Sequence, residues 1–561
     1  MNPMRCYGVT VMGAAVWFAV LSMGAGLCAQ EAAAPRHTGV PQDWSQGHIV
    51  FSRDALARQP ELINREPRIR YQTMQRWQAP NSIVPYSADP VPAPVNDSGQ
   101  RDWNLPMGSK VVGHMYPAKF SFDPAATPDC ANDFVVFGMV AFGTPGVGGG
   151  QANLVALNNL YVNSTGTGFC SGTAPNVLFA YNITTVTGGR ISTSPVLSED
   201  GTKIAFVESV PGGSPQAIFH VLTWAPGGAL KSAVVPAPGS MTSLSFSPTA
   251  NNTTSSPWID YATDVVYVGS NKGQVYKITG VFKGTPTPAG NPWPVTVHTN
   301  FHITAPVLDA GRGVLMIGSS DGELYKIDTT TGQLSSLVVG RIGGSSSGIV
   351  APPIVDGTSG TTFVVSAYGA SSTVPSGYSA VLVEADTGTM GELKRVPIGL
   401  GASTGTALNL YDPALSDDYF NDPSTGVIRL CGTGAADTSP WQYAFGFTVP
   451  GTQPILNGSP SFSRQLVTSL TARCTEWTEF FNPSIGGGTD FFFFGLNQNC
   501  IGASGCVAET TGNTAPTTAA VNGGPSGIIV DNYSTAVGAS SIYLSSENGN
   551  TAYKFTQNGL Q

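Results

Sequence analysis

The stretch VLMIGSSDGELYKID, from Val314 to Asp328, predicts the fold of this chain. It consists of an apolar run, an Asp-Gly pair and a second run in which apolar and polar residues alternate. Two such runs joined by a short turn that contains glycine predict a β-hairpin. Other copies of the stretch carry Asn-Lys-Gly or Glu-Asn-Gly at the same place. We therefore interpret Asp321-Gly322 as a turn and not as part of a reactive site.

The hairpin pattern recurs along the chain. Two close copies are DVVYVGSNKGQVYKIT (Asp264 to Thr279) and SIYLSSENGNTAYKFT (Ser541 to Thr556). Five further segments keep only the first strand of the pattern, namely Asp133 to Met139, Lys203 to Ser209, Thr362 to Tyr368, Val427 to Thr433 and Asp490 to Asn497. Eight copies at intervals of roughly 50 to 70 residues predict a propeller or a solenoid.

Each repeat unit is long enough for four strands. A strand such as TAPVLDAG (Thr304 to Gly311) precedes most hairpins, and a variable strand such as LSSLVVG (Leu334 to Gly340) follows them. Four antiparallel strands form one propeller blade, whereas a parallel β-helix would need shorter coils of more constant length. We therefore predict an all-β fold, an eight-bladed β-propeller with seven blades as the alternative, preceded by a short, partly helical N-terminal extension.

The composition favours short strands and tight turns over helices. The 561 residues include 68 glycines and 42 prolines, both of which oppose helix interiors. Charged residues make up only 11% of the chain, and the net charge is −9. A net negative charge argues against a nucleic-acid partner.

The N-terminus has the features of a secretion signal. An apolar region from Val9 to Leu27 follows Arg5, the one charged residue among the first 30, and we predict cleavage after Ala29. A retained membrane anchor and a lipid on Cys28 are the alternatives. No later stretch is long and apolar enough to span a bilayer. We therefore predict a periplasmic or extracellular protein with no transmembrane span after cleavage.

The sequence divides into three regions: a signal peptide (1–29), an N-terminal extension (30–110) and the propeller (111–561). Within the extension, residues 51–78 predict one or two short helices interrupted by prolines, with Ser52 capping the first. Residues 84–99 form a Pro-rich linker. We expect the extension to pack on the propeller or to remain loose, and the alternative is that it docks to a partner, an envelope component or a neighbouring copy.

Six cysteines follow the signal peptide: Cys130, Cys170, Cys431, Cys474, Cys500 and Cys506. An even number in an exported chain predicts disulfides. If the opening hairpin supplies the third and fourth strands of its blade, the first two cysteines lie on one face of the propeller and the next two on the other. The last two share one loop. We therefore predict the pairs Cys130–Cys170, Cys431–Cys474 and Cys500–Cys506.

The pattern V-x-V-G-S-x-D-G-x-L-Y-x-I-D resembles the repeat of quinoprotein-type (PQQ-like) β-propellers, at blade level from about Lys119 to Phe555. The resemblance implies the fold, in a class that includes PQQ-dependent alcohol dehydrogenases and non-enzymatic envelope scaffolds. Those dehydrogenases carry an adjacent Cys-Cys pair, which this sequence lacks. They also carry a tryptophan after the T-G-K/Q turn, where Leu334 and Ser335 stand here. We therefore expect no cofactor.

Two motifs suggest enzymatic or metal chemistry, but the surrounding sequence does not predict the secondary structure that such sites require. G-x-S-x-G occurs at Gly344 to Gly348 and at Gly401 to Gly405, but the sequence around the first motif does not predict the strand and helix of a nucleophile elbow. His298 and His302 have the spacing of zinc ligands on a helix, yet nearby prolines favour a strand or loop.

Two other groups could bind a ligand. Asp417, Asp418 and Asp422, with Asp412 just before them, are weak candidate Ca²⁺ ligands. Their spacing fits no EF-hand loop, and we favour a solvated turn. The segments WIDY (Trp258 to Tyr261) and WQYAF (Trp441 to Phe445) could stack on sugars, but aromatic residues in strands usually serve the core.

We expect an exported, non-enzymatic propeller that binds a protein or glycan partner through its loops, because buried strands leave recognition to the connections between them. The long loop GTPGVGGGQAN (Gly143 to Asn153) is one candidate. The main alternative is a secreted polysaccharide hydrolase or lyase, which would need two facing carboxylates in a cleft. A PQQ-dependent dehydrogenase is a more remote alternative. We identify no catalytic residue.

Overall fold

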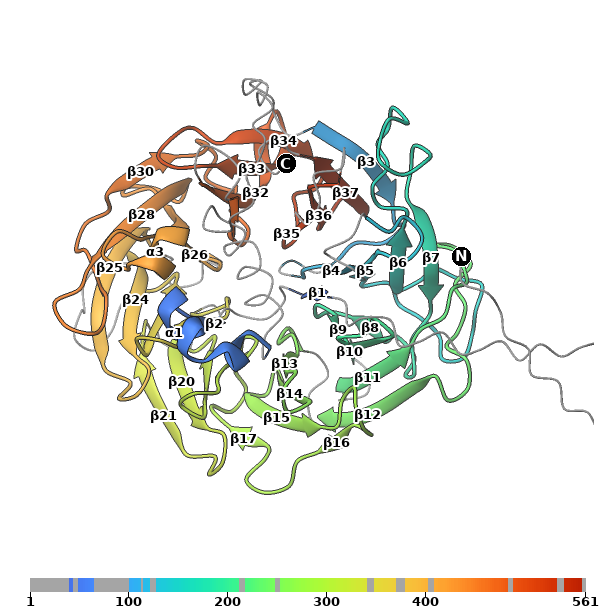
Figure 1. The fold of residues 1–561 in the computed structure, drawn as a ribbon, viewed down its shortest axis with the longest axis horizontal. Coiled ribbons are helices and arrows are strands. Elements are labelled where there is room, and N and C mark those ends of the chain that lie inside the picture. The colour runs from blue at the N-terminus through green and yellow to red at the C-terminus, as the bar shows by residue number, and fades with distance from the viewer. Residues whose placement is uncertain are drawn as a thin grey trace, which may run out of the picture. The chain divides into compact units, whose positions relative to one another are not determined.

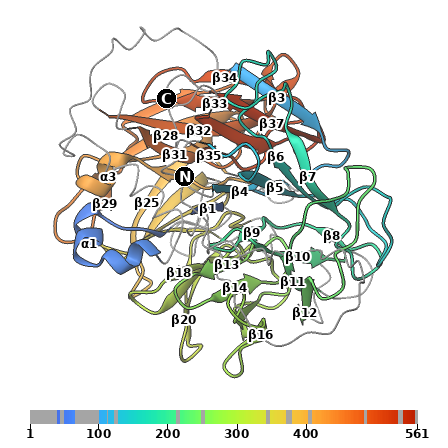
Figure 2. The ribbon, with the colours of Figure 1, turned by 45° about the vertical axis from the view of Figure 1, so that its right-hand side comes forward.

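A computed structural model describes residues 40–43, 49–64, 100–111, 113, 115–121, 128–210, 217–247, 253–340, 348–369, 379–401, 408–482, 488–531 and 539–556. All of them belong to the unit His37–Gln561. Within this unit, eight sheets form a ring around a central axis (Figure 1), and Figure 2 shows the same blades from an oblique direction. The predicted eight-bladed β-propeller is confirmed.

The strands of the first four blades run from the centre outward as follows. Blade 1 consists of β4 (Ala118–Ser121), β5 (Phe134–Gly138), β6 (Leu154–Asn158) and β7 (Asn176–Tyr181). Blade 2 consists of a divided inner strand, β8 (Arg190–Ile191) and β9 (Val196–Leu197), then β10 (Lys203–Ser209), β11 (Ala217–Thr223) and β12 (Met241–Ser247). Blade 3 consists of β13 (Trp258–Asp260), β14 (Val265–Gly269), β15 (Gln274–Thr279) and a divided outer strand, β16 (Thr287–Pro288) and β17 (Val295–Thr296). Blade 4 consists of β18 (Val307–Asp309), β19 (Val314–Gly318), β20 (Glu323–Asp328) and β21 (Leu334–Val338).

The remaining blades follow the same plan. Blade 5 consists of β22 (Ile354–Asp356), β23 (Thr361–Ser366), β24 (Ser379–Asp386) and β25 (Glu392–Leu400). Blade 6 consists of β26 (Ala414–Leu415), β27 (Val427–Thr433), β28 (Pro440–Thr448) and a divided outer strand, β29 (Ile455–Leu456) and β30 (Phe462–Gln465). Blade 7 consists of β31 (Thr478–Asn482), β32 (Thr489–Ile501), β33 (Ser504–Thr510) and β34 (Thr517–Val521). Blade 8 consists of β35 (Ile529–Asp531), β36 (Ser541–Ser545), β37 (Thr551–Thr556) and β3 (Gln100–Pro106). The helical elements are α1 (Arg53–Arg58), the 3-10 helix η1 (Pro60–Asn64) and α3 (Asp417–Asn421).

Burial decreases from the centre of a blade to its rim, as blade 4 shows. All residues of β18 and β19 are buried, β20 alternates between buried and half-buried positions, and β21 alternates between half-buried and exposed ones. The turn between β19 and β20 contains Gly322 at φ 87°, a conformation that glycine adopts without strain. Asp321 accepts hydrogen bonds from the Glu323 amide (3.0 Å) and the Tyr325 hydroxyl (2.7 Å). These contacts give the Asp-Gly pair its turn role.

The predicted strand order within a blade is wrong by one position. The hairpin from Val314 to Asp328 supplies the second and third strands of blade 4, not the third and fourth. The preceding strand β18 is the innermost, and β21 is the outer strand of the same blade instead of the first strand of the next. A hairpin pattern alone does not show which of its strands lies nearer the axis. The eight predicted copies of the first hairpin strand become the second strands of the eight blades.

The N-terminal extension closes the ring. β3 pairs antiparallel with β37 and is the outermost strand of blade 8, whose other three strands come from the C-terminal end of the described chain. The propeller therefore includes residues 100–106, and the predicted boundary at residue 111 lies too late. The strand was missed because its partner is more than 400 residues away in the sequence, so no local hairpin signal marks it.

Buried ion pairs connect the strands at this closure. Asp102 of β3 pairs with Lys554 of β37 at 2.7 Å. Lys119 of β4 in blade 1 pairs with Asp531 of β35 in blade 8 at 2.8 Å and donates to the Tyr161 hydroxyl. All five side chains are buried. Burial raises the pKa of Asp102 and of Asp531 even though each carboxylate faces a lysine, and burial lowers the pKa of Lys554. Loss of solvation thus outweighs the attraction between the partners.

Two further strands of the extension lie at the centre of the ring. β1 (Val40–Asp43) pairs with β4, the innermost strand of blade 1, and β2 (Ile49–Val50) pairs with β22, the innermost strand of blade 5. Blades 1 and 5 face each other across the axis (Figure 1), so the extension contacts both sides of the centre. α1 follows β2, and the Ser52 side chain accepts from the Ala55 amide, as predicted for its cap. The predicted signal peptide and the predicted Pro-rich linker lie outside the described residues.

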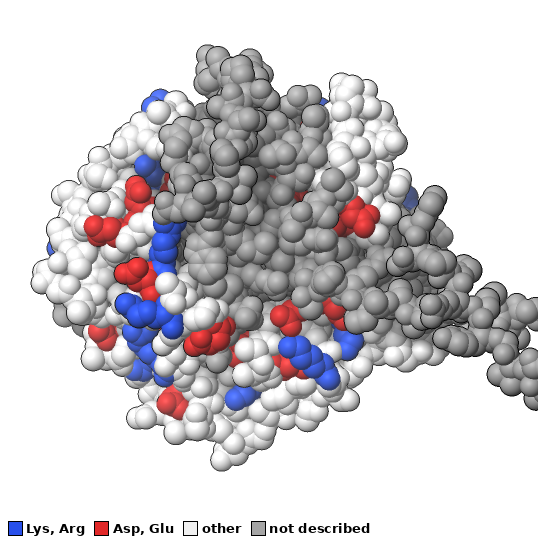
Figure 3. Space-filling view, in the orientation of Figure 1, with Lys and Arg blue, Asp and Glu red and all other residues white. Residues whose placement is uncertain are grey.

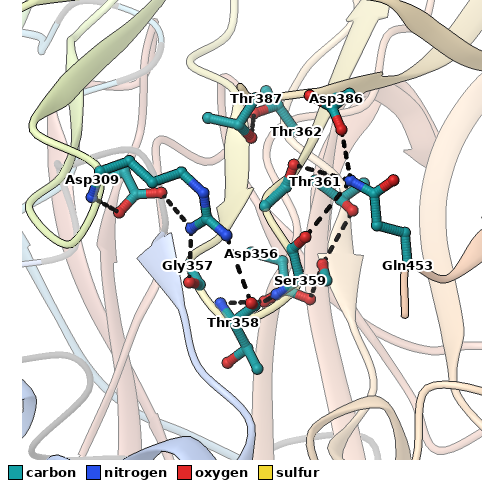
Figure 4. A network of polar contacts seen from close by, with 12 residues as sticks. Asp309, Asp356, Gly357, Thr358, Ser359, Thr361, Thr362, Asp386, Thr387 and Gln453 are labelled. Carbon is teal, nitrogen blue, oxygen red and sulfur yellow. Dashed lines mark hydrogen bonds and ion pairs between the residues drawn. The ribbon is translucent and has the colours of Figure 1, made fainter. Parts of the chain in front are cut away.

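Polar turns connect neighbouring blades (Figure 4). In blade 4, Arg312 pairs with Asp309 and donates to the Gly357 carbonyl of blade 5 at 2.8 Å. Gln453 of blade 6 donates to the Asp386 carboxylate of blade 5 at 2.7 Å. Asp356 of blade 5 accepts from turn residues of its own blade and from a hydroxyl of blade 6. Three consecutive blades are thus joined by side chains of their turns.

Glu384 of β24 makes the stability of this region depend on pH. Its buried carboxylate accepts from the Leu456 amide of blade 6 at 2.8 Å, and burial raises its pKa from 4.5 to about 7. The folded protein thus holds a proton that the unfolded chain releases, so the free energy of unfolding falls as the pH rises through this interval. Glu384→Gln is expected to remove about 1 to 3 kcal/mol of that pH dependence. Urea unfolding of the wild type and of E384Q at about pH 5 and pH 8 tests this. If the stability difference between the two pH values is the same in both proteins, the prediction is wrong.

Candidate binding surface

The three disulfides have the predicted partners: Cys130–Cys170, Cys431–Cys474 and Cys500–Cys506. Cys130 follows β4 and Cys170 follows β6, so both lie on the face where first strands turn into second strands. The other four cysteines lie on the opposite face or at its edge. Shifting the strand order by one position exchanges the two faces for every cysteine alike. The pairing prediction therefore did not depend on the incorrect order.

The aspartates proposed as Ca²⁺ ligands are partly used by the fold. Asp417 begins the short helix α3, is buried, and accepts from the Asn421 side chain at 3.1 Å. Asp422 ends the helix and accepts from Ser424, and burial raises the pKa of Asp418. Within the described ranges, no three His, Cys, Asp or Glu side chains are arranged to hold a metal ion. Asp412 is buried like Asp417, whereas Asp418 and Asp422 are exposed.

The remaining sequence candidates have structural surroundings or lie outside the described residues. His298 packs edge to face against Phe301 with ring centroids 4.5 Å apart, in a segment that is not helical. Burial lowers the pKa of His302. Trp258 and Tyr261 are buried in the core, whereas Trp441 is half-buried. The reactive-serine motifs at 344–348 and 401–405 lie almost entirely outside the described ranges.

A group of exposed apolar side chains lies where blades 1 and 2 meet. Phe142 is 64% exposed, Val147 is 54% exposed, Val235 is 38% exposed and Val234 is 37% exposed. Arg190 extends its guanidinium over the Phe142 ring, 5.3 Å from the centroid. We call these five residues the blade 1–2 patch. Two of its members come from the loop between β5 and β6, the region of the long loop singled out from the sequence.

Backbone hydrogen bonds join the loops that carry the patch. Gly143 donates to the Gly189 carbonyl, beside Arg190. Gly149 donates to the Ala233 carbonyl at 2.8 Å, and Ala233 donates back to Gly150 at 3.0 Å. The β5–β6 loop therefore lies between the connection into blade 2 and the loop that follows β11. The loops that carry the five patch residues are therefore held side by side.

Buried asparagines hold the β5–β6 loop at its base. Asn182 donates from its side chain to the carbonyls of Thr144 and Val147, each at 2.8 Å. Asn153 accepts from the Ile183 amide at 2.9 Å. A Cβ at Gly143 would come within 1.9 Å of the Thr184 hydroxyl, so glycine is needed for this close approach. The loop thus displays apolar side chains on a base of buried polar contacts.

A second buried group supports the connection into blade 2. Glu208 accepts from the Thr185 and Val186 amides, and its carboxylate lies 3.0 Å from His220 Nε2. Burial opposes the ionised form, but the bonds from His220, Thr185 and Val186 outweigh it and lower the pKa of Glu208. The other ring nitrogen of His220 lies 2.9 Å from the Ser243 hydroxyl. An ionised, fully bonded Glu208 therefore fixes the segment that leads to Arg190.

Arg190 gives the patch a positive charge. Its Nε atom is buried and has no hydrogen-bond partner, and no carboxylate of the described chain forms an ion pair with its guanidinium. Burial lowers the pKa of Arg190, yet arginine remains protonated at neutral pH. Sequence reasoning missed this residue, because the contact with Phe142 joins two blades and no local motif marks it.

Removing the Asn182 side chain tests how the patch is held. Asn182→Ala deletes two hydrogen bonds at the loop base, each worth about 1 kcal/mol, so amide exchange of residues 143–150 is expected to quicken by about tenfold or more. Hydrogen–deuterium exchange with mass spectrometry measures this. Asn163→Ala is the matched control, because Asn163 holds a different loop through Thr165 and Thr167. Equal exchange of 143–150 in wild type and N182A would show that the loop is held by other contacts.

No protein-family model matches this chain, and no curated protein matches it. Many solved structures do. BamB from Moraxella catarrhalis is 14% identical over 82% of this chain and 100% of that chain, with a TM-score of 0.43. Sqt1 from Saccharomyces cerevisiae is 11% identical over 82% and 99% of the two chains, with a TM-score of 0.47. The Dos1 propeller is 11% identical over 82% and 95%, with a TM-score of 0.46.

Proposed function

We propose that this protein is an exported propeller that binds a partner protein through the blade 1–2 patch. The supporting observation is the patch itself: four apolar side chains are displayed to solvent on loops that buried polar contacts hold in place. Single exposed apolar residues are common on soluble proteins, but a contiguous group on a structured surface is typical of interaction sites. A protein that binds in this way needs no catalytic group.

The chemistry of the patch favours a polypeptide that combines apolar and acidic side chains. Three of the four apolar residues are valines, which pack against aliphatic or aromatic side chains but offer no flat ring on which a sugar could stack. The Arg190 guanidinium is a ready partner for a carboxylate, and Arg binds carboxylates through paired hydrogen bonds. We therefore favour an acidic, apolar protein segment over a glycan.

Nucleic acid does not fit the described surface well. Figure 3 shows one face of the molecule, on which basic and acidic side chains are intermixed over the described residues. Phosphate backbones bind stripes or patches of one sign. The net charge of −9 adds to this argument.

Export is supported by the disulfides. Three disulfides among six cysteines are typical of proteins that fold in an oxidising compartment. None of the helices in the described ranges is long and apolar enough to cross a membrane. Mass spectrometry of the protein isolated from the envelope and the culture medium of the producing cells tests both export and cleavage after Ala29. Retention in the cytoplasm with reduced cysteines would contradict this part of the proposal.

Peptide selection tests the binding function directly. A random peptide library is panned against the wild-type protein, with counter-selection on the double variant Phe142→Ser/Val147→Ser. We expect enriched peptides to combine aliphatic or aromatic residues with Asp or Glu. Enrichment of basic peptides, or of peptides that bind the variant equally well, would contradict the assignment of the patch.

A further inference from the structure

The third strands of several blades carry an ionisable residue at one equivalent position. Strand register identifies this position, because each residue pairs with the third residue of the repeated apolar run: Lys277 with Tyr267, Lys326 with Met316, Glu384 with Phe363, Glu509 with Phe493 and Lys554 with Tyr543. The same place in the repeat therefore holds a lysine in blades 3, 4 and 8 and a glutamate in blades 5 and 7.

In two blades this residue contacts the neighbouring blade near the connection between its third and fourth strands. Lys326 of blade 4 donates to the Gly388 carbonyl, in the turn between β24 and β25 of blade 5. Glu384 of blade 5 accepts from the Leu456 amide of β29, which follows the corresponding turn in blade 6. The position thus serves a contact between blades, and the adjoining turn supplies the partner.

Glu509 of blade 7 faces a neighbour that is built differently. In blade 8 the fourth strand is β3, from the N-terminal extension, so no direct turn joins it to β37. Within the described part of the chain, no hydrogen bond or ion pair involves the Glu509 carboxylate. Arg101 pairs in register with Phe555 on β37, but it forms no ion pair with Glu509. The closure of the ring leaves this carboxylate without the kind of partner that Glu384 has.

A small pocket opens at this carboxylate. Besides Glu509, its walls include Phe493, Ala519, Ile542 and Phe555, from blades 7 and 8. The pocket has room for about one water-sized group. Most of its walls are apolar, and Thr517 and Thr518 of the outer strand lie among the lining residues. An anionic group in a small apolar pocket suits a compact cation that carries a hydrocarbon chain.

We propose that this pocket binds a primary alkylammonium group, with the Glu509 carboxylate as its counter-ion. The ammonium is a compact donor of three hydrogen bonds, and its size matches the pocket. The ammonium would fill the pocket beside the carboxylate, and its methylene chain would extend outward along apolar side chains at the pocket entrance, as lysine stems do on protein surfaces. A lysine side chain of a polypeptide and a free alkylamine share this chemistry.

Burial predicts how binding depends on pH. It raises the pKa of Glu509 from 4.5 to about 7, so the carboxylate is largely protonated in mild acid and ionised above neutral pH. The other residues that line the pocket, on β32, β33, β34, β36 and β37, are uncharged. Alkylammonium binding is therefore expected to be stronger at pH 8.5 than at pH 5.5.

Titration of the full-length protein with n-butylammonium chloride, followed by NMR or calorimetry, tests the proposal. We expect saturable binding to the wild type and binding about tenfold weaker or more to Glu509→Gln, since a bond to a charged group is lost. Ala519→Leu keeps the charge but narrows the pocket and should also weaken binding. Glu384→Gln is the matched control and should bind like the wild type.

N-acetyl-lysine-N-methylamide distinguishes the two sources of the ammonium group. Binding of this compound with the same dependence on Glu509 assigns the pocket to a lysine side chain, whereas binding of n-butylammonium alone assigns it to a free amine. If wild type shows no saturable binding of either compound, or if E509Q and A519L bind as tightly as the wild type, the proposal is wrong. Circular dichroism establishes that each variant is folded before titration.

Discussion

Replacing Asp102 with alanine is expected to lower the free energy of unfolding by about 3 to 5 kcal/mol, because the buried Lys554 then loses the carboxylate with which it forms an ion pair. The pair joins the N-terminal strand β3 to the C-terminal strand β37 at 2.7 Å, and both side chains are buried. Urea unfolding followed by tryptophan fluorescence gives the change in midpoint.

Two control variants show whether the loss of stability in D102A comes from the buried ion pair at the closure of the ring or from the removal of any charged residue. Glu199→Ala breaks an ion pair with Lys283 that is largely exposed, and it should cost less than about 1 kcal/mol. The double variant Asp102→Leu/Lys554→Met removes both buried charges and should recover most of the stability that D102A loses, since burial penalises each partner. If D102A costs no more than E199A, the ring is not held closed by this pair.

Removing the disulfide between Cys431 and Cys474 is expected to lower the free energy of unfolding by about 4 kcal/mol. The two cysteines are 43 residues apart, and a cross-link of this length restricts the unfolded chain by about that amount. They also pack in the core with Trp477 and Ala414. The double variant Cys431→Ser/Cys474→Ser, unfolded in urea without reductant, measures the loss.

The disulfide between Cys500 and Cys506 is the matched control. Its cysteines are only 6 residues apart, so the same serine substitutions should cost about 2 kcal/mol. A larger loss from the short cross-link than from the long one would contradict the chain-entropy explanation. Peptide mapping without reduction checks that the remaining pairs are unchanged in each variant.

The repeated pattern allowed the ring of blades to be predicted from the sequence. The contacts between blades could not be predicted in this way. Each second strand carries the apolar run that the sequence shows, and the four consecutive phenylalanines from Phe491 to Phe494 form a buried part of β32. The predicted order of strands within a blade was wrong, because a hairpin has the same sequence pattern whether it supplies the second and third strands or the third and fourth. The closing strand β3 was missed, since its partner lies at the other end of the sequence.

The patch could be predicted only in part. Its long glycine-rich loop stands out in the sequence, but the contribution of Arg190 and of Val234 depends on how blade 2 packs beside that loop. Likewise, Glu509 looks like any alternating polar residue of a strand. Among the described residues its carboxylate has no partner, and this follows from the origin of the neighbouring fourth strand, which only the assembled ring shows.

The affinity of one selected peptide tests the central claim most directly. Isothermal titration is performed with the wild-type protein, with Phe142→Ser/Val147→Ser and with Leu334→Ser/Val338→Ser, which alters two comparably apolar residues on the exposed strand β21 of blade 4. We predict that the patch variant binds at least about tenfold more weakly, because the few residues that dominate an interface each cost more than about 1 kcal/mol when they are removed. We predict that the blade 4 variant binds like the wild type. Equal affinity for all three proteins would contradict binding through the blade 1–2 patch.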